Sequence, residues 1–223
     1  MRTLVLAWIA EPMTLATDYI LAALATAFAV SLWRIARAPA RRWAAALVAL
    51  AVGAFAGGTS HGFAPHLGPL GEAVLWKATV FAIGFASFGM LAASAQATLG
   101  PRAGRWTTAI AAVKLAIYLI WMAQHDDFKF VILDYAPNMA AVLAFNLYGW
   151  RRKRISGSLA IAAGVIVSFA AAGVQQSGFA LHRHFNHNDL YHVIQMIGLW
   201  LFYRGASRQA LGPRSGTHGT IET

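Results

Sequence analysis

Apolar runs long enough to cross a lipid bilayer recur along the whole chain, and this feature limits the fold more than any other. A membrane-spanning helix needs about 20 predominantly apolar residues. Hydrophobic residues make up 58% of the 223 positions, charged residues only 12%, and the mean hydropathy is +0.55. These values are too apolar for an ordinary soluble domain. The sequence therefore predicts an all-α integral membrane protein.

Seven such runs are separated by Pro, Gly and basic residues. We expect residues 1–204 to form one seven-transmembrane helix bundle, and residues 205–223, rich in Gly, Ser, Arg and Thr, to form a disordered cytoplasmic tail. The short apolar start of the chain is interrupted before any cleavage site and is expected to be retained. The seven expected spans are residues 13–33, 43–63, 70–99, 106–123, 128–150, 155–180 and 188–203.

Basic residues alternate between the connections. The first, third and fifth connections and the tail contain 4, 2, 4 and 3 Lys or Arg residues, whereas only Arg2, Lys129 and Arg183 lie near the others. Cytoplasmic loops are the ones enriched in Lys and Arg. We therefore expect the N-terminus outside and the C-terminus in the cytoplasm of a bacterial-type cytoplasmic (inner) membrane.

The net charge of +10 has a related explanation. In a soluble protein it would suggest nucleic acid as a partner, but these basic residues lie in short loops, where they contact anionic lipid headgroups. No nucleic-acid motif is present. The absence of cysteine excludes disulfides, thiolate metal sites and cysteine nucleophiles.

Several ionisable side chains lie just inside the outer ends of the expected spans. They are about 3 to 9 Å inside the helix ends at a rise of about 1.5 Å per residue. A charge at this depth is costly unless it is paired, hydrated or bound to metal. We expect them to converge on one polar pocket that opens outward. The residues are Asp18, His61, Glu72, Asp134 and His192, with Gln175 and Gln176 reaching the same layer.

Four of the eight histidines lie between residues 182 and 192. His192 shares a helix face with Asn188, four residues earlier, and His187 lies at the start of the last span. Three neutral imidazoles and a water molecule form a known catalytic zinc arrangement. His61, His187 and His192 are thus candidate zinc ligands. Alternatively, His192 only holds helices together by hydrogen bonding to Asp18 or Glu72.

The Ser60-His61 pair, Glu72 at the start of the third span and the run from Asn188 to His192 resemble motifs of the CREST superfamily. This superfamily includes the alkaline ceramidases and the progestin and adiponectin receptor relatives. Its zinc hydrolase site uses a serine and a histidine on helix two, an aspartate on helix three and two histidines four apart on helix seven. The resemblance implies that His61 and His192 bind zinc and that Glu72 replaces the aspartate.

The chain departs from this pattern at two places. Asn188 stands where the first histidine of the pair is expected, and His187 is one residue away, about 100° around a helix. His187 could bind zinc only if the last helix begins after it. Gly57 holds the position of the family serine, while Ser60 is adjacent to His61.

The expected function is that of a zinc-dependent membrane hydrolase acting on a lipid amide or ester. Glu72 is the candidate base, Ser60 the candidate oxyanion stabiliser, and Asp18 completes the catalytic set. The stretch from Glu11 to Asp18 resembles an acidic element that binds calcium in ceramidases.

Two other classes of protein remain open. A receptor or a proton- or cation-coupled transporter would use Asp18, Glu72, Asp134 and His192 in an outward-facing pocket. A haem protein would use His61 and His192 as axial ligands.

Overall fold

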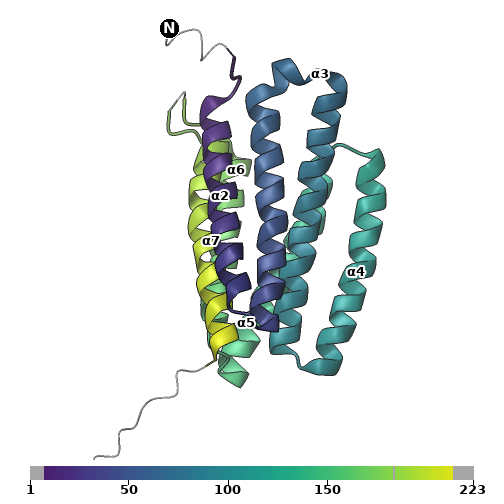
Figure 1. Cartoon of the computed structure of the whole chain (residues 1–223), viewed down its shortest axis with the longest axis vertical. Helices are drawn as coiled ribbons and strands as arrows, with labels where there is room; N and C mark the ends of the chain where they lie inside the picture. The colour runs from purple at the N-terminus through teal and green to yellow at the C-terminus, as the bar shows by residue number, and fades with distance from the viewer. Residues whose placement is uncertain (1–7, 183, 213–223) are drawn as a thin grey trace, which may run out of the picture.

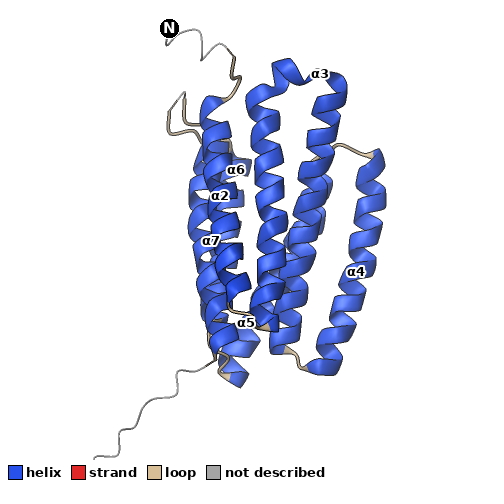
Figure 2. Ribbon diagram, viewed as in Figure 1, coloured by secondary structure: helices blue, strands red, loops and turns tan. Residues whose placement is uncertain are grey.

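The computed structural model describes residues 8–182 and 184–212, which form six helices joined by short connections (Figure 1, Figure 2). The expectation for the retained start of the chain falls largely on residues 1–7, and most of the expected tail falls on 213–223, so both lie outside the described residues. The helices are α2 (Pro12–Arg34), α3 (Ala38–Thr98), α4 (Pro101–Gln124), α5 (Lys129–Lys153), α6 (Ser158–Ser177) and α7 (His187–Leu211).

Five of these helices, α2 to α6, are long and apolar enough to cross a membrane, judged over the described residues. The all-helical prediction is confirmed, and the five helices indicate a multi-pass membrane protein. Helix α7 is not among the five; its first turns carry the polar run from His187 to His192.

Helix α3 reverses direction at Gly68 and so forms two arms, residues 38–67 and 69–98, that lie side by side (Figure 1). Gly68 has φ 63° and ψ 169°, a conformation that side-chain-bearing residues avoid. Pro65 and Pro69 flank it and lack the amide hydrogens that would continue the helix. The expected spans 43–63 and 70–99 thus correspond to the two arms, with a turn instead of a loop between them.

Local sequence signals explain where the other helices begin. Pro12, Pro39 and Pro101 lie in the first turn of α2, α3 and α4, where a missing amide hydrogen costs nothing. Helix α7 begins with a capping box, in which the Asn186 side chain and the Asp189 side chain bind each other's backbone amides. The α4 helix starts at residue 101 rather than 106 because Pro101 initiates it.

The hydrophobic core lies among α2, α3, α5, α6 and α7. Trp43 stacks on Phe202, and Leu32 and Met90 pack in the same fully buried cluster. Helix α4 lies at the edge of the bundle and packs on the second arm of α3, where Tyr118 contacts the cluster around Val80 (Figure 1).

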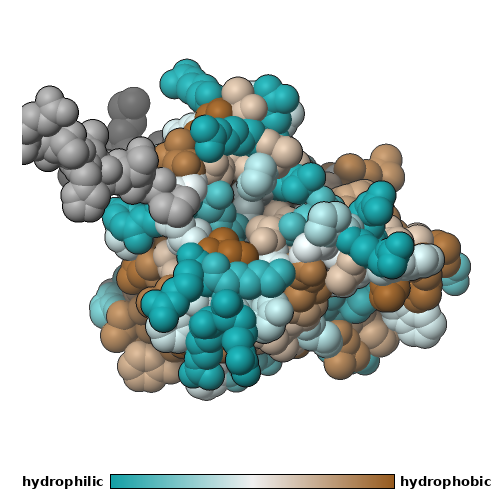
Figure 3. All heavy atoms as spheres, turned by 90° about the horizontal axis from the view of Figure 1, so that it is seen from below, coloured by the Kyte–Doolittle hydropathy of each residue, from teal (hydrophilic) through white to brown (hydrophobic). Residues whose placement is uncertain are grey.

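The two ends of the bundle differ in charge. We call one the basic end, and Figure 3 shows hydrophilic side chains across it. We call the other the cavity end; it holds Glu11, the Gly68 turn, the connection 125–128 and the described residues 178–182 and 184–186. Exposed basic side chains at the basic end are Arg34, Arg37, Arg41, Arg42, Arg102, Arg105, Arg151, Arg152, Lys153, Arg154, Arg204 and Arg208.

Helices α6 and α7 pack closely at the basic end. A Cβ added to Gly205 would lie 2.5 Å from Cγ1 of Ile161 and 2.8 Å from the backbone oxygen of Gly157. Small residues allow such close backbone contact. Because Ala206 and Ala210 are also buried, α7 continues to Leu211. The expected disorder of residues 205–211 is therefore wrong.

Replacing Gly205 with valine should force α6 and α7 apart. Overpacking of this kind costs about 1 to 3 kcal/mol, which corresponds to a melting temperature lower by roughly 5 °C for a chain of this size. Heating detergent-purified protein and following the folded fraction by size exclusion would measure it. The control is Gly173→Ala on α6, where nothing lies within 4 Å of the added Cβ. Equal melting temperatures for the two variants would contradict close packing at Gly205.

Candidate functional site

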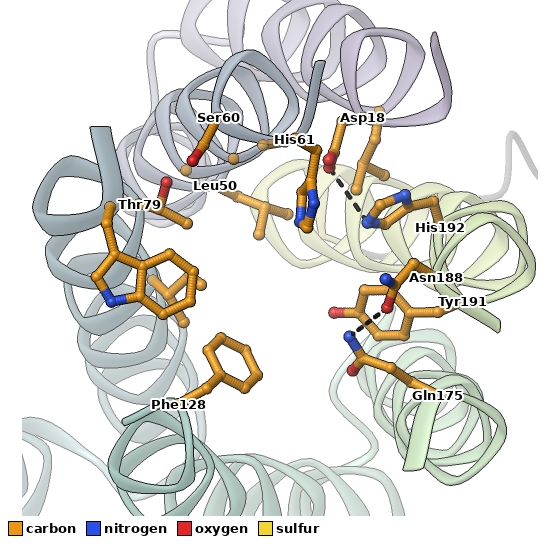
Figure 4. Close-up of a pocket in the computed structure, with 16 residues that line it drawn as sticks. Asp18, Leu50, Ser60, His61, Thr79, Phe128, Gln175, Asn188, Tyr191 and His192 are labelled. Atoms are coloured by element: carbon orange, nitrogen blue, oxygen red, sulfur yellow. Dashed lines mark hydrogen bonds and ion pairs between the residues drawn. The ribbon is translucent and has the colours of Figure 1, made fainter. Parts of the chain in front are cut away.

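A cavity of about 270 Å³, which we call the main cavity, lies among α2, both arms of α3, α6 and α7. One side is polar, and Leu21, Leu50, Ile83 and Phe128 line the rest. Figure 4 shows Phe128 across the cavity from His192. A cavity that is polar on one side and apolar on the other suits an amphiphilic ligand. The polar lining residues are Asp18, Ser60, His61, Thr79, Gln175, Asn188, Tyr191 and His192.

The most buried polar contact of this cavity joins α2 to α7. Oδ1 of Asp18 lies 3.2 Å from Nε2 of His192, and the two residues are 5% and 7% exposed. Nδ1 of His192 lies 2.9 Å from the Thr17 hydroxyl. That hydroxyl also lies 3.0 and 3.1 Å from the backbone oxygens of Met13 and Thr14, and either oxygen can accept its single hydrogen. The Thr17 hydroxyl therefore either accepts the Nδ1 hydrogen of His192 or donates its own hydrogen to Nδ1, depending on the tautomer of the imidazole.

The tautomer of His192 decides what the contact with Asp18 requires. With its hydrogen on Nδ1, a neutral His192 presents a lone pair at Nε2 to the carboxylate of Asp18. In that tautomer the two acceptors 3.2 Å apart need a proton or a metal cation between them, whereas a His192 with its hydrogen on Nε2 donates directly to the Asp18 carboxylate. The Asp18–His192 contact is thus either a direct hydrogen bond or a pair of acceptors around a shared proton or cation.

His61 approaches the same place from the first arm of α3. Figure 4 shows its ring beside Asp18 and His192. Its Nδ1 lies 3.4 Å from Oε1 of Glu11. Both imidazoles are therefore held through Nδ1 by an oxygen atom outside the cavity. Histidines that bind metals are usually oriented in this way by a carboxylate, carbonyl or water.

The donor set can be compared with a zinc site. Two ligand atoms at zinc bonding distance and the tetrahedral angle lie roughly 3.3 to 3.4 Å apart, close to the 3.2 Å between Asp18 and His192. Two imidazoles and one carboxylate is also the ligand set of several catalytic zinc enzymes. However, within residues 8–182 and 184–212 no three His, Asp or Glu side chains meet closely enough to hold a metal ion. Asp18, His61 and His192 are side chains of the types that bind zinc. To complete such a site, His61 would have to move closer to Asp18 and His192.

Glu72, the expected base, does not line the main cavity. It is exposed and lines a neighbouring cavity of about 510 Å³, which we call the outer cavity, together with Ser60, Trp76 and Asp126. Trp76 is one turn deeper on the same helix face and lines both cavities. Its indole therefore lies between Glu72 and the main cavity. Ser60 also lines both cavities, and its role as oxyanion stabiliser stays a prediction.

His187, the third expected zinc ligand, is the first residue of α7 and does not line the main cavity. The capping box between Asn186 and Asp189 sets the start of the helix. His187 is therefore within the helix and about 100° away from Asn188, which does line the cavity. The structure thus places two of the three expected imidazoles together.

Asp134 also lies outside the main cavity. It is 8% exposed and pairs with Lys114 of α4, whose ammonium group also donates to the backbone oxygen of Asp134 at 2.9 Å. Gln176 is exposed and does not line the cavity either. The expected single polar layer is therefore divided between the main cavity and this ion pair.

The two carboxylates expected near calcium line different cavities. Asp18 lines the main cavity, whereas Glu11 lines a smaller one of about 170 Å³ with His184 and Asp189. One oxygen of Asp189 accepts a bond from the Thr14 hydroxyl at 2.9 Å, and the other belongs to the capping box. Calcium at Glu11 and Asp18 stays a prediction.

Three polar residues of the site were not anticipated from the sequence. Thr17 orients His192, Thr79 lines the cavity from the second arm of α3, and the Tyr191 hydroxyl points into the cavity (Figure 4). Thr79 is seven residues, or about two turns, after Glu72 and shares its helix face. This seven-residue spacing from Glu72 is the sequence signal that could have identified Thr79. For Thr17 no periodicity could indicate that it contacts α7.

The fold and the cavity define a class: a multi-pass helical protein with a small amphiphilic cavity near one end. A family profile matches residues 13–211, and the chain belongs to this family, which is described as a family of unknown function (DUF6962). No curated protein and no solved structure is significantly similar to the chain.

Proposed function

We propose that this protein is a seven-helix membrane hydrolase that uses zinc, held by Asp18, His61 and His192, to cleave a lipid amide or ester. The observation behind the proposal is the buried Asp18–His192 contact, in which a carboxylate oxygen and an imidazole nitrogen lie 3.2 Å apart on the polar side of the cavity. His61 beside this contact supplies a further ligand.

The membrane topology is part of the proposal. If each arm of α3 crosses the bilayer, α2 to α7 provide seven crossings. The basic end then faces the cytoplasm of a bacterial-type inner membrane, because Lys and Arg are enriched in cytoplasmic loops. The main cavity opens toward the opposite leaflet, from which a lipid could enter beside Phe128 and Trp76.

Each residue near the contact has a defined task. Asp18 and His192 bind the cation, and Thr17 and Glu11 keep the imidazoles of His192 and His61 in their tautomers. Zinc bound in such a site supplies an activated water molecule and polarises a carbonyl group. The apolar wall at Leu21 and Leu50 would hold the acyl chain. Glu72 has no assigned step, because Trp76 lies between it and the cavity.

The resemblance of His61 and the Asn188–His192 run to the CREST hydrolases supports the same proposal, with two differences. Asp18 of α2 takes part in place of a second histidine on α7, and no acid from the second arm of α3 lines the cavity among the described residues.

A hydrolysis assay tests the proposal. Protein in lipid nanodiscs is incubated with a panel of lipid amides and esters, and released fatty acid is measured by mass spectrometry. We expect product from wild type and a loss of at least about 100-fold in Asp18→Asn, because the substitution removes a proposed zinc ligand. Asp127→Asn changes an exposed carboxylate outside the cavity and is the control. Failure of the whole panel with zinc-loaded protein would contradict the hydrolase assignment.

A second function is a proton- or cation-coupled transporter or receptor. It is favoured by one observation: no three metal-binding side chains converge in the described part of the chain. A proton between Asp18 and His192 would satisfy the same two acceptors. Proton-coupled uptake by liposomes that contain metal-free protein would support this second function.

A further inference from the structure

Two side-chain amides meet on the polar wall of the main cavity. Nε2 of Gln175, near the end of α6, donates to Oδ1 of Asn188 on α7 at 3.1 Å. Figure 4 shows this pair beside Tyr191 and across the cavity from Phe128. Both residues line the cavity and are partly buried. Neither residue takes part in the proposed zinc chemistry.

The hydrogen bond between Gln175 and Asn188 uses the oxygen of the Asn188 amide but not its nitrogen. The oxygen of Asn188 is engaged by Gln175, which fixes the plane of the Asn188 amide. The two hydrogens on Nδ2 of Asn188 have no acceptor among the described residues. Asn188 precedes His192 by one turn on the same helix face, about 6 Å along the axis. A preoriented donor therefore lies one turn above the Asp18–His192 contact.

The surroundings select the acceptor that this donor can bind. The carboxylates of Asp18 and Glu11 lie near this end of the cavity and disfavour an anionic ligand. Leu21 and Leu50 provide an apolar wall for a hydrocarbon chain. The acceptor that fits both conditions is the carbonyl oxygen of a neutral acyl group.

We propose that Nδ2 of Asn188 binds the acyl carbonyl oxygen of the ligand and that Gln175 is the positioning residue that aims it. This inference rests on the proposed function only in taking an acyl lipid as the ligand. The position that holds a zinc ligand in the resembled family thus serves substrate binding here.

The test compares two neutral probes of similar length, octyl acetate and the ether formed by replacing its carbonyl with CH₂. Binding is measured by calorimetry in nanodiscs with chelator present, after subtraction of the signal from empty nanodiscs. We expect wild type to bind the ester about 10-fold more tightly than the ether, as for one hydrogen bond. Asn188→Leu should bind both equally, and Gln175→Met should show a reduced preference.

Gln176→Met is the matched control, since Gln176 is the exposed neighbour of Gln175 and lies outside the cavity. It should keep the full preference. Equal binding of ester and ether by wild type, undetectable binding of both, or a preference that survives Asn188→Leu would each overturn the inference. If Asn188→Leu does not fold, full preference in Gln175→Met overturns the positioning role. Because metal is absent throughout, these outcomes are independent of whether the zinc proposal holds.

Discussion

Wild-type protein purified without a histidine tag should contain about one zinc ion per chain, and His192→Ala should contain almost none. His192 contributes the buried Nε2 that faces Asp18 at 3.2 Å, so its loss leaves one fixed ligand atom. Elemental analysis after dialysis against a weak chelator measures the ratio. His61→Ala should lose zinc as well, because His61 is the remaining imidazole of the cavity.

Other variants separate a metal site from a merely structural histidine. Thr17→Val removes the oxygen that fixes Nδ1 of His192 and should weaken zinc binding about 10- to 100-fold without abolishing it. His187→Ala should keep zinc, since His187 does not line the cavity. A wild-type protein without metal would sink the zinc assignment, and proton binding between Asp18 and His192 would then explain the contact.

The sequence predicted the helices well because apolar length and basic loops are local properties. The expected spans of α2 and α5 match Pro12–Arg34 and Lys129–Lys153 to within three residues at each end. The last helix was expected to end near residue 203, since the chain from Gly205 onward is rich in Gly, Ser, Arg and Thr. Its burial against Ile161, which depends on another helix, overrides that preference.

The candidate site was only partly predictable. The shared depth of Asp18, His61 and His192 indicated a common pocket, and all three line the main cavity. Glu72 was placed with them because it lies near the outer start of the expected third span, in the same shallow layer. Spacing along the chain does not specify how two arms are arranged after a turn such as that at Gly68. The position of the Trp76 side chain at the boundary of the two cavities depends on tertiary packing, which the sequence pattern does not show.

The exclusion of Asp134 from the cavity has a similar origin. The depth of Asp134 in its own helix could not show that Lys114 of α4 contacts it. Helical periodicity predicts which residues share a face of one helix, but not which helix packs against that face. Lys114 and Asp134 are 20 residues apart and meet only through the turn between α4 and α5.

Lys114→Met should be one of the most destabilising single substitutions in the chain. It leaves the carboxylate of Asp134, whose side chain is 7% exposed, without its partner inside the bundle. Breaking a buried pair costs about 3 to 5 kcal/mol, and we expect about 3 kcal/mol because the Lys114 side chain is 37% exposed. Thermal unfolding in detergent should show a melting temperature lower by roughly 10 °C.

The double variant Lys114→Met/Asp134→Asn tests the origin of this effect. It removes both charges, so much of the lost stability should return, as expected when an unpaired buried charge is the cause. Lys129→Met is the matched control, since Lys129 pairs with Asp127 at 2.6 Å on the exposed surface and should not change the melting temperature measurably. A Lys114→Met protein as stable as wild type would mean that Asp134 carries no charge in the folded bundle.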